Sequence, residues 1–182
     1  LAGAARHYLN RHGVAVGKTV GVYTACDSAY WVALDLKKGG VGIAAIIDLR
    51  EAPDTTLVNA ARAAGLEVLT GHAVLSTGGR LRVKSMTVAP AKGGAKRTIA
   101  VDALIMSAGW TPSVHLFSQS RGKVRFDEAT GNFLPGTYVQ DCTCAGGGNG
   151  TTTLDAAIAE GWAAGVEAAK LAGFKAGKSK AP

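Results

Sequence analysis

Residues 18–48 read KTVGVYTACDSAYWVALDLKKGGVGIAAIID, and the fold depends on the pattern in this stretch. The apolar run from Lys18 to Tyr23 predicts a strand. Ser28 to Lys38 predicts a helix that ends at Gly39-Gly40, because glycine is common just after helices. Val41 to Leu49 is dense in valine and isoleucine, as parallel strands buried on both faces are. Strand, helix and strand in this order predict a βαβ unit.

The sequence on both sides continues this alternation of helices and strands. Leu1 to Arg11 has apolar residues at helical spacing and predicts a short helix. A third helix, capped by Asp54 or Thr55, runs to Ala64, and Leu66 to Thr70 predicts a third strand. Such a run is typical of a doubly wound sheet.

Beyond residue 70 the strands become shorter. Three segments alternate apolar and polar residues and predict a half-exposed antiparallel β-meander: 73–75, 80–89 and 97–101. ALIMS at 103–107 returns to a buried strand, and AGWTP at 108–112 follows it. We then expect a turn, a strand, a glycine cluster and a long helix: 127–132, about 137–139, 145–150 and about 152–171.

The predicted fold class is α/β, a Rossmann-like three-layer parallel sheet with an antiparallel β-meander. We expect a Rossmann-like domain with the meander over residues 14–112, a second segment over 113–174, and a disordered tail over 175–182. The first residue is leucine rather than methionine, which suggests a piece of a longer polypeptide.

Charge and composition narrow the function classes. The formal net charge is +7, but the basic residues are scattered without interleaved aromatics, which disfavours a nucleic-acid role. A basic face that meets an acidic partner chain fits equally well. The longest apolar run, Val41 to Ile47, is too short to span a membrane, and LAGAARHYLNRHG lacks the apolar core of a signal peptide.

The turn of the βαβ unit, Thr24-Ala25-Cys26-Asp27-Ser28, contains no glycine. A dinucleotide-binding turn uses glycines so that the backbone can turn tightly and approach the pyrophosphate. Asp27 and Ser28 are instead good helix N-caps, and a capping carboxylate puts negative charge where a phosphate would bind. The sequence therefore predicts that the fold is kept and the phosphate turn is lost.

Asp48 supports the opposite interpretation. It ends the second strand about twenty residues after the turn, where an acidic residue commonly binds the ribose hydroxyls. The alternative is an ordinary strand-end residue close to Arg50. Without the glycines, the acidic residue alone does not indicate a working site.

The stretch AGGGNGTTTLDAA, which begins at Ala145, is the stronger candidate for a nucleotide site. It places a glycine-rich loop directly before a helix, with threonine caps and a Thr152-x-x-Asp155 capping box. Successive backbone N–H groups at such a place can form an anion cradle. The alternative is a loop of small residues that serves only close packing.

The three cysteines, Cys26, Cys142 and Cys144, form no disulfide-scaffold or C-x-x-C spacing, which favours a reducing, cytoplasmic setting. No histidine pairing typical of zinc accompanies them. The sequence also lacks a G-x-S-x-G elbow, an H-E-x-x-H motif and a Walker lysine motif, so we expect no catalytic side chain and no metal site.

The order of the elements resembles the two-dinucleotide-domain flavoprotein reductases, in which an NAD-type domain is inserted into an FAD-type domain. DALIMSAGWTP matches the exit from the inserted domain, and TYVQDCTCAGGGNGTTTLDAAIAEGWAAG matches the returning part of the FAD-type domain. Over residues 5–170, and most specifically in GWTPSVHLFSQSRGK, the chain is similar to α subunits of bacterial heterotetrameric sarcosine oxidases.

This resemblance implies a role as the central nucleotide-binding or scaffold portion of an oxidoreductase. Such oxidases demethylate N-methylglycine to glycine and hydrogen peroxide and pass the one-carbon unit to tetrahydrofolate. The resemblance implies a non-redox NAD held in the complete α subunit, an FMN shared with the β subunit, and an FAD on the β subunit. The implied partners are the other subunits, with neither nucleic acid nor membrane.

Two parts of the family's sequence are not found in this chain. One is the first half of the FAD-type domain, which carries a GxGxxG motif, and the other is the folate-binding domain. The usual Gly-Asp pair of the returning segment is replaced by DCTCAG at 141–146, which disfavours ordinary flavin contact. The implied nucleotide contacts are Gly146, Gly148, Asn149, Gly150, Thr151 and Thr152. Two other functions remain open, a free-standing scaffold or interaction module and an NAD(P)H-dependent flavin reductase-like enzyme. By itself the chain is expected to be inactive.

Overall fold

The computed structural model describes residues 1–175, and the chain forms two compact units, Leu1–Gly109 and a second that begins at Trp110. The predicted disordered tail, 175–182, lies outside the described residues except for Lys175. The two units are described separately below.

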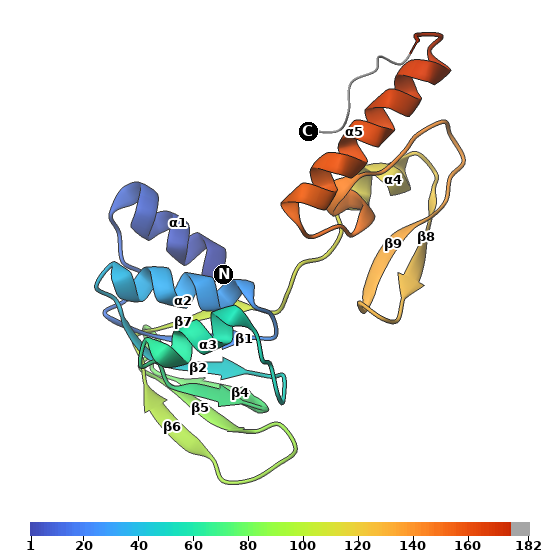
Figure 1. The fold of residues 1–182 in the computed structure, drawn as a ribbon. Coiled ribbons are helices and arrows are strands. Elements are labelled where there is room, and N and C mark those ends of the chain that lie inside the picture. Colours follow the sequence, from blue (N-terminus) through green and yellow to red (C-terminus); the bar gives the residue numbers. More distant parts are fainter. Residues whose placement is uncertain (176–182) are drawn as a thin grey trace. The chain divides into compact units, whose positions relative to one another are not determined.

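The first unit has three layers (Figure 1). Its elements are α1 (Ala2–His12), β1 (Thr19–Thr24), α2 (Ser28–Lys38), β2 (Gly42–Asp48), α3 (Thr56–Ala63), β3 (Val68–Thr70), β4 (His72–Gly78), β5 (Ser85–Pro90), β6 (Arg97–Ala100) and β7 (Ala103–Ser107). A parallel sheet in the order β3-β2-β1-β7 carries the helices on one face and the antiparallel sheet β4-β5-β6 on the other. The predicted fold class is confirmed.

Two apolar cores explain why the central strands are apolar on both faces. Between the sheet and the helices, the fully buried side chains include Tyr30, Leu36 and Ile46. Between the sheet and the meander, Ile47 of β2 packs with Met86 of β5. Neighbouring residues of β2 therefore point into opposite cores, as the two-residue period of a strand requires.

Position 21 of β1 requires glycine, because the β-meander packs closely against it. A Cβ atom at Gly21 would lie 2.5 Å from the Met86 sulfur, closer than side chains pack. Met86 is completely buried, so it fills the space above the glycine. The glycine in the TVGVYT strand therefore serves close packing of two sheets.

Helix α3 begins with a side-chain cap, and this cap carries a testable stability effect. Of the two caps allowed by the sequence, Thr55 is the N-cap, and its hydroxyl accepts a hydrogen bond from the Val58 N–H at 3.4 Å. We expect Thr55→Ala to lower the free energy of unfolding by about 1 kcal/mol, because one N–H at the helix start loses its partner. Urea unfolding checks this value.

Asp54→Ala is the matched control for the cap. Asp54 accepts a hydrogen bond from the Asn59 side chain at an exposed position. Its replacement should change the free energy of unfolding by less than about 0.5 kcal/mol. Equal losses in the two variants would contradict the assignment of Thr55 as the cap.

Within the described residues, the second unit contains four short elements and one long helix. They are α4 (His115–Gln119), β8 (Lys123–Asp127), β9 (Asn132–Thr137), the 3-10 helix η1 (Gly146–Asn149) and α5 (Leu154–Leu171). The predicted strand near 137–139 is wrong, because the strand ends at Thr137 and belongs to the antiparallel hairpin β8-β9. The Asp127 carboxylate fixes the turn by accepting hydrogen bonds from the Thr130 N–H and hydroxyl.

Helix α5 starts later than the sequence predicted and lacks the predicted capping box. Its N-cap is Thr153, without a side-chain capping bond, so the proposed Thr152–Asp155 box does not form. No residue of α5 is buried, although Leu154 and Ile158 are apolar. No helix within residues 1–175 is long and apolar enough to cross a membrane.

Candidate functional site

The first candidate site lies at the carboxyl ends of β1 and β2, where parallel sheets of this class bind ligands. Asp27 stands at the N-cap position of α2, but its side chain makes no capping bond. Its carboxylate instead accepts a hydrogen bond from Nη1 of Arg50 at 2.8 Å. The predicted capping role of Asp27 is therefore wrong, because a guanidinium group lies within reach and is a stronger partner than a backbone N–H.

Asp48 is fully engaged by partners within the chain. Its carboxylate is completely buried and accepts hydrogen bonds from the Tyr30 hydroxyl at 2.7 Å and from Nη2 of Arg50 at 2.8 Å. The Arg50 backbone N–H and Nε bind the other carboxylate oxygen, at 2.9 and 3.1 Å. We name Asp27, Tyr30, Asp48 and Arg50 the Arg50 network.

The Arg50 network shifts the pKa of its members. Burial alone would raise the pKa of Asp48, but hydrogen bonds from Arg50 and Tyr30 outweigh it and hold the pKa below its ordinary value. The hydrogen bond to Asp48 raises the pKa of Arg50. Burial, followed by the bond to Asp48, raises the pKa of Tyr30. Asp48 is thus a carboxylate and Arg50 a cation at neutral pH.

The lowered pKa of Asp48 predicts a pH-dependent stability. The folded chain binds the Asp48 proton less tightly than the unfolded chain, whose aspartate pKa is about 3.9. The stabilisation is complete above that value and is lost as the pH falls through the folded pKa. Near neutral pH, we expect the free energy of unfolding of the native chain to be larger than that of the Asp48→Asn variant. The difference should shrink as the pH falls below about 4.

Urea unfolding of both proteins across this pH range measures the difference. Other carboxylates, such as Asp35 and Glu67, also have lowered pKa values. Their contributions cancel when the two proteins are subtracted. A difference that stays constant with pH would contradict the ionised, bonded state of Asp48.

The acidic residues at this end of the sheet already have partners within the chain. The Asp27 carboxylate bonds to Arg50, and both oxygens of the buried Asp48 carboxylate accept hydrogen bonds. The Thr24 hydroxyl bonds to backbone carbonyl oxygens of Cys26 and Ser107. The interpretation of Asp48 as a strand-end residue beside Arg50 is the one the geometry supports.

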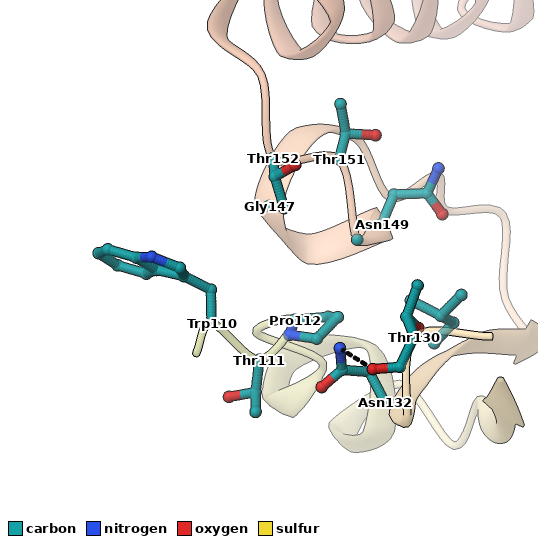
Figure 2. A pocket seen from close by; sticks show the side chains of 11 residues that line it. Trp110, Thr111, Pro112, Thr130, Asn132, Gly147, Asn149, Thr151 and Thr152 are labelled. Carbon is teal, nitrogen blue, oxygen red and sulfur yellow. Dashed lines mark hydrogen bonds between the residues drawn. The ribbon is translucent and has the colours of Figure 1, made fainter. Parts of the chain in front are cut away.

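The second unit contains a pocket of about 380 Å³ (Figure 2). The glycine loop between β9 and α5 forms one side, and Pro112 with the hairpin residues Thr130 and Asn132 forms the opposite side. The eleven lining residues are Trp110, Thr111, Pro112, Thr130, Asn132, Leu134, Gly147, Asn149, Gly150, Thr151 and Thr152. None of these side chains is ionisable.

Four of the six residues implied by the resemblance line this pocket: Asn149, Gly150, Thr151 and Thr152. Gly146 is buried in η1 and Gly148 lies in the same turn, and neither lines it. Sequence reasoning missed Gly147 and the side formed by residues 110–112 and the hairpin. AGWTP was noted as the end of a strand and as part of the family resemblance, but no local pattern indicated that it would meet a hairpin tip.

Gly150 fixes the shape of the loop. Its φ is +88°, in the left-handed region that glycine adopts at little cost. A Cβ atom there would also lie 2.6 Å from Cδ2 of Leu134, a pocket residue. Both the backbone conformation and the available space therefore require glycine.

Glu160 of α5 binds the inner side of the glycine loop. One carboxylate oxygen accepts the Gly146 N–H at 2.9 Å, and the other accepts the Thr151 hydroxyl. The Asn149 side chain also hydrogen-bonds to this carboxylate. The Thr151 bond and then the Gly146 bond lower the pKa of Glu160. Sequence analysis missed Glu160, because its position in the second turn of α5 shows no contact with a loop before the helix.

The cysteines carry no further site. Cys26, Cys142 and Cys144 are free thiols; Cys142 is exposed, and the other two are partly buried. Among residues 1–175 no group of three histidine, cysteine or acidic side chains is placed to hold a metal ion.

No protein-family model matches the chain. It is 37% identical over 185 residues to the sarcosine oxidase subunit alpha of Corynebacterium sp. (strain P-1), covering 96% of this chain and 18% of that protein. It is 38% identical over 161 residues to the subunit of the same name from Rhizobium meliloti (strain 1021), covering 88% of this chain and 16% of that protein. The chain thus spans less than a fifth of the length of these relatives.

Solved structures show the same fold at low sequence identity. L-proline dehydrogenase from P. horikoshii matches 95% of this chain and 30% of its own, with a TM-score of 0.63 and 20% identity. Thioredoxin reductase from Lactococcus lactis matches 85% of this chain and 52% of its own, with a TM-score of 0.57 and 18% identity. The resemblance drawn from the sequence is confirmed: over nearly all its length, the chain is homologous to one segment of sarcosine oxidase α subunits.

Proposed function

We propose that the chain is the central portion of an oxidoreductase α subunit and that the pocket of the second unit is one side of a nucleotide site. The observation that carries this proposal is the pocket itself. Asn149, Gly150, Thr151 and Thr152 meet Pro112 and the hairpin around about 380 Å³ of space. Its apolar surfaces and few polar groups are typical of a site for a small organic ligand.

The first unit serves as scaffold in this proposal. The Arg50 network occupies the position at which a dinucleotide would bind, so hydride delivery from a nicotinamide held there is disfavoured. The three packed layers give a rigid domain to which other parts of an assembly can attach. This division of roles favours the scaffold and nucleotide function over an NAD(P)H-dependent flavin reductase.

The cofactors, partners and reaction that we propose for the complete assembly are those that the family resemblance implies. We propose NAD as a bound, non-redox nucleotide of the α subunit, with FMN and FAD held together with a flavin-bearing β subunit. The proposed reaction converts N-methylglycine to glycine and hydrogen peroxide, with tetrahydrofolate accepting the one-carbon unit. We place the assembly in the cytoplasm, consistent with three free cysteines.

Nucleotide analysis of the protein in its native assembly tests this proposal. The assembly is purified, its small molecules are released with acid, and they are identified by mass spectrometry. We expect NAD in an amount equal to that of the chain, and loss of NAD without loss of flavin when Asn149 and Thr152 are replaced together by alanine and valine. An assembly without nucleotide, or NAD retained fully by the double variant, would contradict the proposed site.

A further inference from the structure

Glu160 stands out because it occupies the anion cradle that the glycine loop was predicted to form. The loop offers a buried backbone N–H from Gly146, a hydroxyl from Thr151 and a side-chain amide from Asn149. All three bond to the same carboxylate. Groups of this kind would otherwise hold a phosphate, which accepts hydrogen bonds and carries negative charge as a carboxylate does.

The negative charge of Glu160 also opposes the binding of a phosphate at the glycine loop. A second anion beside the Glu160 carboxylate would be repelled, and the three donors would have to exchange one partner for another. None of the side chains that line the pocket is positively charged to offset this repulsion. A phosphate held by this loop is therefore disfavoured.

The remaining pocket surface suits an uncharged group. Trp110 and Pro112 give flat apolar surface, and the Asn132 amide donates a hydrogen bond to the Thr130 carbonyl oxygen. In Figure 2, Thr151 lies on the side of the loop that faces α5, whereas Pro112 and Asn132 lie on the other side. Asn149 and Thr151 thus both line the pocket and bond to Glu160, so the carboxylate fixes part of the pocket wall from the α5 side.

We propose that Glu160 is a positioning residue: its bonds to Gly146, Asn149 and Thr151 hold the glycine loop in the shape that contacts an uncharged part of the nucleotide. This inference rests on the nucleotide site proposed above. Glu160 acts through the loop, because it does not itself line the pocket. The phosphates of the nucleotide are then bound by parts of the assembly other than this loop.

Binding of adenosine and ADP to the native assembly, freed of its resident nucleotide, tests the inference by equilibrium dialysis. We expect Glu160→Ala to weaken both ligands by the same factor, about tenfold, because three loop anchors are lost and the loop contacts the shared, uncharged part. Glu160→Gln keeps the volume and one acceptor, so its loss should be smaller. Contributions from elsewhere in the site cancel, because each variant is compared with the native protein.

Each alternative outcome has a distinct meaning. If phosphate displaces Glu160, both variants will bind ADP more tightly relative to adenosine, and the inference is overturned. Unchanged binding of both ligands by Glu160→Ala would also overturn it. Glu167→Gln, an exposed position on the same helix, should leave both affinities unchanged. Failure of the native assembly to bind either ligand would instead contradict the proposed nucleotide site itself.

Discussion

Replacing Arg50 with alanine is expected to lower the free energy of unfolding of the first unit by about 3 kcal/mol, because it leaves a buried carboxylate without its cation. Asp48 is completely buried and receives three hydrogen bonds from the Arg50 side chain and backbone N–H, two of them from the guanidinium. The Tyr30 bond remains in the variant, and protonation of Asp48 limits the loss. Because of both effects, the expected loss of free energy of unfolding lies at the lower end of the range for broken buried ion pairs.

Urea unfolding followed by circular dichroism, with hydrogen exchange of the β1 and β2 amides, measures this loss. Arg97→Ala is the matched control, because Arg97 also bonds both oxygens of one acidic residue, Glu67. Both side chains of that pair are exposed, and its loss should lower the free energy of unfolding far less than the loss of Arg50 does. Equal losses in the two variants would show that burial of Asp48 does not matter.

Arg50→Lys separates charge from geometry. Lysine keeps the positive charge but cannot bind Asp48 and Asp27 with a planar fork of donors. We expect a stability between those of the native protein and Arg50→Ala. A lysine variant as stable as the native protein would mean that the bond to Asp27 contributes nothing.

The main elements of the first unit could be predicted because their apolar pattern is local. The strand in TVGVYT and the helix between Ser28 and Lys38 follow from spacing alone, and the predicted helix bounds agree with the structure. The partners of Asp27 could not be predicted in this way. Its propensity as a cap is a local property, whereas Arg50 approaches it only after β2 has been placed beside β1.

The second unit was harder to predict for the same physical reason. The hairpin strand KVRFD is almost fully exposed, so burial gives it little alternation to detect. Glu160 lies fourteen positions after Gly146, and their hydrogen bond depends on how the loop folds back on α5. The glycine loop was identified from its composition, but the Glu160 carboxylate that bonds to it could not be predicted.

The two units share one electrostatic feature. In the first, the Asp27 carboxylate lies at the start of α2, and in the second the Glu160 carboxylate accepts bonds from the glycine loop. Asp27 bonds to Arg50 rather than to the N–H groups at the start of α2, whereas Glu160 accepts a loop N–H that a phosphate could otherwise accept. In both units an acidic residue is therefore held by partners within the chain.

Gly150→Ala is expected to weaken nucleotide binding by the native assembly by about a hundredfold. A left-handed backbone conformation costs an L-residue about 1–2 kcal/mol. The new Cβ atom would also lie 2.6 Å from Leu134 Cδ2, so the hairpin side of the pocket must move as well. Together these effects amount to about 3 kcal/mol, which corresponds to about two factors of ten in affinity. NAD affinity, measured by equilibrium dialysis, is the readout.

Two glycines provide controls that separate pocket geometry from general instability. Gly147 also lines the pocket, but a Cβ atom there meets nothing within 4 Å and its φ is not positive. Gly161 lies inside α5 with similar open space, where alanine should favour the helix by about 1 kcal/mol. Gly147→Ala and Gly161→Ala should both keep NAD affinity within about threefold of the native value. If Gly150→Ala also keeps NAD affinity within about threefold of the native value, the left-handed turn at residue 150 does not shape a nucleotide site. That result would contradict the proposal that this pocket binds the nucleotide.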